Sequence, residues 1–238
     1  MSRMRVDDLQ QGGTPAGPLV AVTAYDYAFA RLADQAGADI LLVGDSLGMV
    51  VQGEGTTLPV TLEQMVYHTR CVVRGRERAL VAADLPFRAY KASPEQAFDS
   101  AARLMAEGGA EMVKLEGGGP MVDTVAFLNQ RDIPVMGHLG LTPQSVHQLG
   151  GYRVQARNPD AAAHMVEEAL DLERAGARAL VLEAVPRAVA GRVREAVGIP
   201  VVGIGAGPDC DGQVLVMHDI LGLDERVQPH FARRYVDG

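Results

Sequence analysis

Eight short apolar runs recur along the chain, and this repetition constrains its fold more than any other feature of the sequence. They lie at 19–22, 39–43, 79–82, 112–115, 133–136, 179–182, 201–204 and 214–217. Most of them are separated by segments in which apolar residues have helical spacing, at 28–36, 62–74, 94–107, 121–130, 161–175 and 187–197. Short runs that alternate with helices predict buried parallel strands joined by right-handed crossovers.

Such a chain can close into a (β/α)8 barrel or remain an open doubly wound sheet. Acidic residues follow several different runs, which favours the barrel, because an open sheet usually has one glycine-rich turn after its first strand. At 238 residues, the chain fits a single barrel domain spanning 1–238. Only residues 206–213 separate the last two runs, so we expect a vestigial helix there or a shifted strand.

Composition and charge exclude several classes of partner. The formal net charge of -8 and the lack of a basic cluster argue against nucleic acid. Cys71 and Cys210 are far apart and form no Cys-x-x-Cys pair, so neither a disulfide framework nor a thiolate zinc site is indicated. No apolar run is long enough for a membrane span or a signal core. We therefore expect a cytoplasmic protein without a membrane partner.

Three carboxylates follow or end different runs, and in a barrel they would meet at one mouth. They are Asp45, Asp84 and Glu116. Oxygen ligands without a Cys or His cluster suit Mg²⁺ better than zinc, so the three are predicted to hold Mg²⁺. The alternative is structural, with Asp45 and Ser46 forming a turn and helix cap and Asp84 shaping the turn before a proline. Gathering all three without a cation would raise their pKa values, which favours the metal.

Three further polar residues are candidates for chemistry, and each has a structural alternative. Lys114 could neutralise an anionic substrate or a developing oxyanion, or it could simply pair with Glu116, which shares its face of the strand. His138 lies in a predicted loop between glycines, where a histidine is more often structural than catalytic. Glu183 leaves an apolar run at a tight turn, as expected of a general base, although a helix N-terminus would also favour it.

Several ordered blocks resemble the ketopantoate hydroxymethyltransferase family. They are TAYD at 23–26, LVGDSLG at 42–48, DLPF at 84–87, VKLEG at 113–117 and GHLGLTPQ at 137–144. Further blocks are LGGYR at 149–153, LE and VP at 182–186, GIGAG at 203–207 and DGQVL at 211–215. Alone, GIGAG is unspecific, because it lacks the helix opening and the downstream acid of a dinucleotide site. Ala156 and Ala184 depart from the family's usual Gly and Cys.

The resemblance implies a phosphoenolpyruvate/pyruvate-like barrel that transfers a hydroxymethyl group from 5,10-methylenetetrahydrofolate to 3-methyl-2-oxobutanoate, giving 2-dehydropantoate for pantothenate biosynthesis. It implies one Mg²⁺ per subunit on Asp45, Asp84 and Glu116. By the same resemblance, the oxo acid contacts Asp45, Ser46, Asp84 and Lys114, and Glu183 accepts the proton. Lys114 and His138 are expected to assist catalysis. The resemblance also implies a large homo-oligomer, commonly a decamer.

Two alternatives remain open at the level of sequence. The first is a carbon-carbon lyase of the phosphoenolpyruvate and isocitrate lyase type, which also uses an acidic metal rim and an enolate. It would need an acid or nucleophile in a mouth loop, and Cys71 and Cys210 are not predicted to lie there. The second is a catalytically silent barrel that acts as a binding subunit. The presence of every candidate polar residue argues against it.

Overall fold

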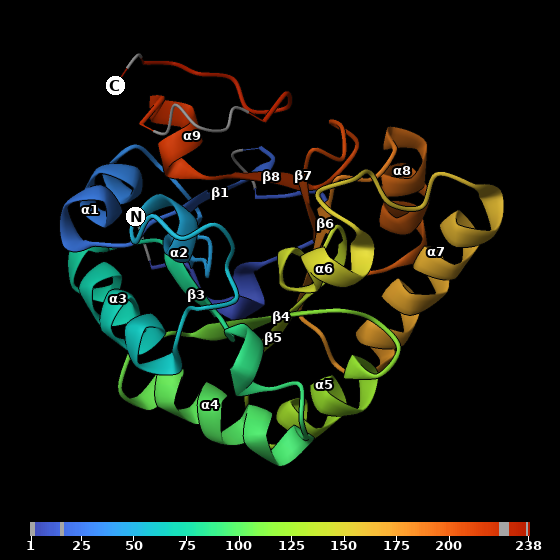
Figure 1. Ribbon diagram of the computed structural model, residues 1–238, viewed down its shortest axis with the longest axis horizontal. Coiled ribbons are helices and arrows are strands. Elements are labelled where there is room, and N and C mark those ends of the chain that lie inside the picture. The colour runs from blue at the N-terminus through green and yellow to red at the C-terminus, as the bar shows by residue number, and fades with distance from the viewer. Residues whose placement is uncertain (1–2, 15–16, 224–228, 237) are drawn as a thin grey trace.

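The eight strands form a closed parallel barrel in a computed structural model, which describes residues 3–14, 17–223, 229–236 and 238 (Figure 1). Every strand pairs with its sequence neighbours, and the last pairs with the first. This confirms the predicted fold class. The strands are β1 Leu19–Thr23, β2 Ile40–Val43, β3 Leu80–Asp84, β4 Met112–Glu116, β5 Val135–Gly140, β6 Ala179–Glu183, β7 Val201–Ile204 and β8 Gly212–Leu215.

Six longer helices pack outside the strands, in the order in which the sequence predicted them. They are α1 Tyr27–Gln35, α3 Leu62–Gly75, α4 Pro94–Ala106, α5 Met121–Asn129, α7 Pro159–Arg174 and α8 Arg187–Ala196. Side chains cap several of them. Thr61 accepts from the Gln64 amide at the start of α3, and Asn158 accepts from the Ala161 amide at the start of α7. These caps satisfy amides that have no partner within the helix and so fix where each helix begins.

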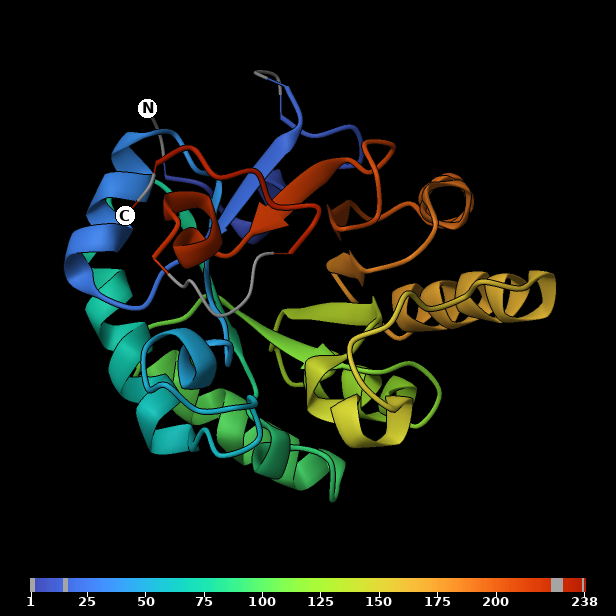
Figure 2. The same cartoon turned by 45° about the horizontal axis from the view of Figure 1, so that its top comes forward.

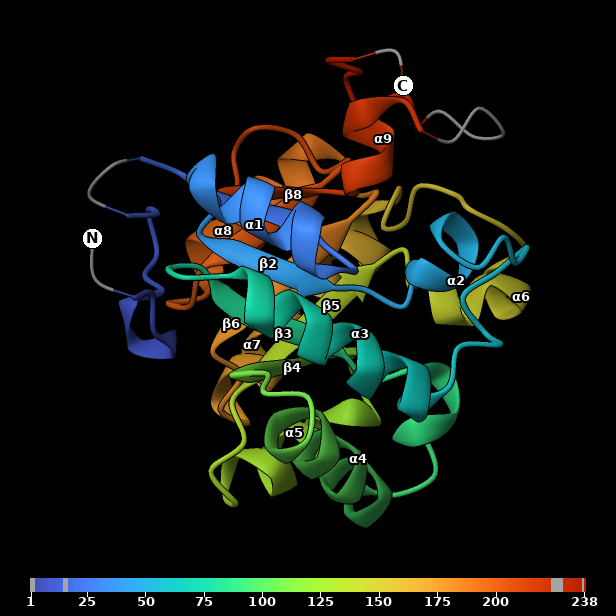
Figure 3. The ribbon, with the colours of Figure 1, turned by 90° about the vertical axis from the view of Figure 1, so that its left-hand side faces the viewer.

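Apolar side chains form two separate layers. One lies inside the barrel and includes Ile40, Leu80 and Met112, and the other lies between the strands and the helices. Met4 and Leu9, on either side of the short 3-10 helix Val6–Asp8, belong to the inner layer. Figure 3 shows this N-terminal segment at the opposite end of the barrel from α2 and α6. The segment therefore closes the end that lies away from the candidate site.

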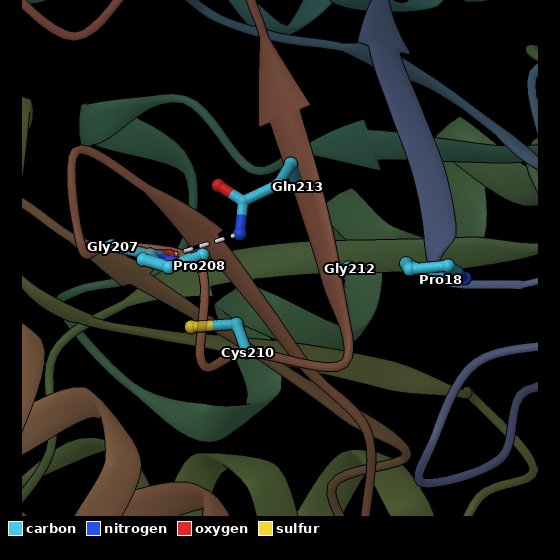
Figure 4. Close-up of a pocket in the computed structure, with 6 residues that line it drawn as sticks. All are labelled: Pro18, Gly207, Pro208, Cys210, Gly212 and Gln213. Atoms are coloured by element: carbon cyan, nitrogen blue, oxygen red, sulfur yellow. Dashed lines mark hydrogen bonds between the residues drawn. The ribbon is translucent and has the colours of Figure 1, made fainter.

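The connection between β7 and β8 contains no helical residue (Figure 4). The prediction of a short connection is confirmed, but even a vestigial helix is missing from residues 205–211. The last strand was predicted at 214–217 and is β8 at Gly212–Leu215, so that prediction was wrong by two residues. Pairing of Gly212 with Leu19 explains the difference, because a side chain at 212 would collide with Leu19. Met217 instead begins α9.

Three short helices lie beyond the carboxyl ends of the strands: α2 Leu47–Val50, α6 Val146–Leu149 and α9 Met217–Leu221. α2 and α6 are neighbours (Figure 3), and the Tyr152 hydroxyl that follows α6 lies 3.7 Å from the Met49 sulfur. α9 lies beside α1 (Figures 1 and 2), with the rings of His218 and Phe29 6.3 Å apart. Among the described residues, no helix is both long and apolar enough to cross a membrane.

Candidate active site

The carboxyl ends of five consecutive strands bring the predicted polar residues to one mouth. Asp45 and Ser46 follow β2, Asp84 ends β3, Glu116 ends β4 and Glu183 ends β6. His138 was predicted in a loop but lies within β5, paired in register with Glu116 and Val181. The run 133–136 located this strand too early, because its second half is interrupted by glycines and a histidine that carry no apolar signal. All of these side chains except those of Glu183 and Ser46 are buried.

Lys114 pairs with Asp84 rather than with Glu116, the partner that its spacing suggested. The Lys114 Nζ lies 3.0 Å from Asp84 Oδ1, and both side chains are at most 5% exposed. The two residues are register partners on β3 and β4, which places their side chains next to each other. Burial favours the neutral amine, but the surrounding carboxylates outweigh it and raise the pKa of Lys114. The ammonium is therefore held in its charged form.

The Asp45 carboxyl is the least compensated acid of the site. Its backbone amide donates to Asp84 Oδ2 at 3.0 Å, which brings the two side chains together. Burial, and then the charges of Asp84 and Glu116, raise the pKa of Asp45 well above its usual range. Burial also raises the pKa of Asp84, although Lys114 opposes that shift. Crowded carboxyls that share one ammonium are what a site for an additional cation requires.

Ser46 does not cap the short helix that follows it, so the capping alternative fails for this residue. Its Oγ lies 2.8 Å from the Tyr25 hydroxyl instead. Tyr25 is buried two residues after β1, and burial raises the pKa of its hydroxyl. The pair therefore joins the mouth at β1 to the acidic residues after β2.

His138 connects Glu183 with the acidic cluster. Its Nε2 lies 3.2 Å from Glu183 Oε2, and its Nδ1 lies 3.6 Å from Glu116 Oε1 and 3.3 Å from Lys114 Nζ. Burial and the Lys114 charge favour the neutral ring, but the nearby carboxylates of Glu116 and Glu183 outweigh them. They raise the pKa of His138 to about 9.

The backbone around Glu183 has an unusual conformation. Ala184 has φ 48°, a left-handed value that costs a residue with a Cβ roughly 1–2 kcal/mol. Gly140, the register partner of Glu183, has φ 92°, and a side chain there would collide with the Glu183 carbonyl oxygen. The sharp turn allows the Glu183 side chain, 17% exposed, to end the strand beside His138. Strain of this kind often accompanies functional positions.

Two buried residues of the site were not predicted by the sequence. Gln144 Nε2 donates to Asp45 Oδ2 at 2.8 Å, and the Gln144 backbone amide donates to Glu116 Oε2 at 3.0 Å. The Tyr90 hydroxyl donates to Gln144 Oε1 at 2.6 Å. Gln144 lies in one of the blocks shared with the family. Neither residue directly follows an apolar run, which is the feature by which the other residues of the mouth were predicted.

The acidic side chains of the mouth could provide oxygen ligands for a divalent metal. Within the described ranges, no three His, Cys, Asp or Glu side chains are arranged as a ready metal cage. Mg²⁺ does not require one, because it usually retains waters or substrate oxygens beside one or two carboxylates. Four carboxylates, from Asp45, Asp84, Glu116 and Glu183, face the ammonium of Lys114 and the ring of His138. The acids of the mouth share one buried ammonium, that of Lys114, so the donor chemistry fits a divalent cation.

Comparison with known sequences identifies the family. The family described as ketopantoate hydroxymethyltransferase matches residues 3–238. The chain belongs to this family. Among its relatives, the 3-methyl-2-oxobutanoate hydroxymethyltransferase of Magnetococcus marinus is 56% identical over 236 residues, which is 99% of this chain and 88% of the relative. The enzyme of the same name from Gloeobacter violaceus is 58% identical over 223 residues, 93% of this chain and 85% of the relative.

Solved structures with the same fold are more distant in sequence. A putative phosphonomutase from Burkholderia cenocepacia aligns with a TM-score of 0.66 at 18% identity, covering 88% of this chain and 89% of that one. A 2,3-dimethylmalate lyase of the PEP mutase/isocitrate lyase superfamily aligns with a TM-score of 0.62 at 19% identity, covering 84% and 74%. These structures support the barrel architecture alone. Membership of the hydroxymethyltransferase family makes the chain a transferase enzyme.

Proposed function

We propose that the chain transfers a hydroxymethyl group from 5,10-methylenetetrahydrofolate to 3-methyl-2-oxobutanoate, giving 2-dehydropantoate, with Mg²⁺ held by Asp45, Asp84 and Glu116. One observation carries the proposal. In a member of this family, the acids predicted to bind metal and the acid predicted to accept a proton meet at one buried mouth, connected through His138. Mg²⁺ bound there would supply the positive charge that polarises the keto group and stabilises an enolate.

The side chains divide the remaining work. The Lys114 ammonium, held charged by Asp84, would balance the charge of the oxo acid, and Asp45, Ser46 and Asp84 would contact that substrate. Glu183 would take the proton from C3, because its carboxylate is the acid of the group that is least buried and most open to the mouth. His138 Nε2 lies 3.2 Å from Glu183 Oε2, so the ring would help to orient that carboxylate. The enolate carbon would then bond to the one-carbon unit as its bonds to the folate nitrogens break; water would supply the hydroxyl oxygen, and tetrahydrofolate would leave.

Deuterium exchange tests the first half of this reaction without folate. We expect the chain to exchange the C3 hydrogen of 3-methyl-2-oxobutanoate with D₂O when Mg²⁺ is present, and to lose most of that rate with a chelator. Glu183→Gln should slow exchange by roughly a hundred- to ten-thousand-fold, the usual contribution of a general base. Glu195→Gln, an exposed change on α8, is the matched control. Exchange at the parental rate in Glu183→Gln would exclude this residue as the base.

A lyase reaction gains no support from the mouth. Cys71 lies on α3, and Cys210 lies in the connection that precedes β8, so neither thiol is placed to serve as the acid or nucleophile that a lyase would need. Product analysis separates the two reactions directly. Incubation with isocitrate or methylisocitrate should leave them intact, whereas the oxo acid with methylenetetrahydrofolate should give 2-dehydropantoate. A silent barrel would do neither and would show no Mg²⁺-dependent binding of the oxo acid in calorimetry.

A further inference from the structure

The side-chain amide of Gln144 is held at three points inside the site. Gln144 is 3% exposed and lies in the 3-10 helix Pro143–Ser145, between β5 and α6. Its Nε2 donates to Asp45 Oδ2 at 2.8 Å and to the Leu85 carbonyl oxygen at 2.9 Å, and its Oε1 accepts from Tyr90 at 2.6 Å. Its backbone amide also donates to Glu116 Oε2. One residue thus contacts two of the three acids proposed to bind metal.

The orientation of this amide is determined by its partners. Both partners of Nε2 are acceptors, so they use both of its N–H groups. The partner of Oε1 is a hydroxyl, which can donate. A flipped amide would place Oε1 against the Asp45 carboxylate and a carbonyl oxygen, so only one orientation satisfies all three contacts. Gln144 can therefore act only as a donor towards Asp45.

Tyr90 completes the arrangement. Its hydroxyl has one hydrogen and two acceptors, Gln144 Oε1 at 2.6 Å and the Glu116 carbonyl oxygen at 3.3 Å, and the shorter contact takes it; its oxygen accepts from the Glu116 backbone amide at 3.1 Å. Burial, followed by the charge of Glu116, raises the pKa of Tyr90 well above its usual range, so the hydroxyl remains a donor. The ring is fully buried, which leaves Tyr90 no room to turn away from Gln144.

We infer that Gln144 and Tyr90 are positioning residues that orient the carboxylates of Asp45 and Glu116 and thereby set the affinity of the site for a divalent cation. The inference rests on the proposed function, because it concerns the same acids. The terminal torsions of Asp and Glu side chains have broad, weakly preferred ranges, so a carboxylate takes its orientation from its hydrogen bonds. Here one oxygen of each acid is fixed, and neither carboxylate can rotate without breaking a buried hydrogen bond.

The test uses Mn²⁺ as a probe of the free enzyme, so it needs no turnover. Electron paramagnetic resonance of unbound Mn²⁺ gives its affinity for the parent, for Gln144→Met and for Gln213→Met. The second variant is a matched control, because Gln213 is an exposed residue of β8 whose side chain donates to the Gly207 carbonyl oxygen (Figure 4). Loss of an outer contact that orients a metal ligand usually weakens affinity by about 10- to 100-fold, and we expect this for Gln144→Met alone.

Tyr90→Phe is the milder variant, because it keeps the buried ring and removes one hydroxyl. It should also weaken Mn²⁺ binding, by a smaller factor than Gln144→Met. If the melting curve of Gln144→Met shows that this variant does not fold, Tyr90→Phe provides the test instead. Parental affinity in a folded Gln144→Met or Tyr90→Phe enzyme would overturn the inference. If the parent enzyme itself binds no Mn²⁺, the metal role in the proposed function is wrong, and the inference is overturned with it. That outcome is distinct from parental affinity in the variants, which would overturn the inference alone.

Discussion

Replacement of Lys114 by Met removes the ammonium that lies 3.0 Å from Asp84 Oδ1, within a pair whose side chains are at most 5% exposed. Met has a similar length, so the change deletes a charge and leaves most of the packing in place. Asp84 would then have to remain ionised without its buried partner or take up a proton. Breaking a buried pair in this way typically costs about 3–5 kcal/mol.

Protonation sets an upper limit on that loss. At pH 7, protonating an aspartate with an ordinary pKa costs about 4 kcal/mol, because each pH unit is worth about 1.4 kcal/mol. We therefore expect a loss of about 3–4 kcal/mol at pH 7. In the variant, the folded-state pKa of Asp84 lies above its unfolded value, so stability is lost as pH rises through the folded pKa. At pH 5.5 the loss should shrink to about 2 kcal/mol.

Urea unfolding in the presence of a chelator measures both values. The control is Lys91→Met, the chain's other lysine, whose ammonium lies 5.3 Å from the centroid of the Phe87 ring. A contact of that kind is worth about 1 kcal/mol or less, with no steep dependence on pH between 5.5 and 7. The reasoning is refuted if Lys114→Met loses no more stability at pH 7 than Lys91→Met, or if its deficit grows as the pH falls.

Three further predictions concern Asp211, Gly140 and Cys210. Asp211 accepts from two backbone amides and an arginine, so Asp211→Asn should lower the free energy of unfolding by about 3 kcal/mol, while exposed Asp209→Asn should change the melting curve little. Gly140→Ala should slow C3 exchange and lower the melting temperature, because its Cβ would collide with β6, whereas Gly191→Ala on α8 meets no atom within 4 Å and should not. Burial and nearby acids raise the pKa of Cys210 to about 11, so its alkylation should be slow at pH 7.5 and speed up about tenfold per pH unit; a rate equal to that of a free thiol would contradict this.

The architecture could be predicted because its signals are local. Helical spacing marks the six longer helices, and apolar runs mark most of the strands. The errors occur where a strand depends on contacts far away in sequence. Gly212 enters β8 because it pairs with Leu19, almost the whole chain away. The inner packing of Met4 has the same origin, and no periodicity marks it.

The sequence predicted which polar residues meet at one end of the barrel but not which of them contact each other. Placing Asp45, Asp84 and Glu116 at one mouth needs only the rule that parallel strands share an end. The pairing of Lys114 with Asp84 instead of Glu116 depends on register between β3 and β4, which the sequence does not specify. Gln144 follows no apolar run, and its place in the site comes from four buried hydrogen bonds to residues that meet only after folding.

Met4 and Leu9 close the end of the barrel that lies away from the acidic residues, and this limits how reactants reach the active site. Because apolar side chains fill the barrel interior below the acidic residues, reactants and products would both pass through the mouth of the barrel. Under the proposed function, the small oxo acid would therefore bind before the larger folate, and the products would leave in the reverse order. Initial-rate and product-inhibition patterns should accordingly show ordered rather than random addition.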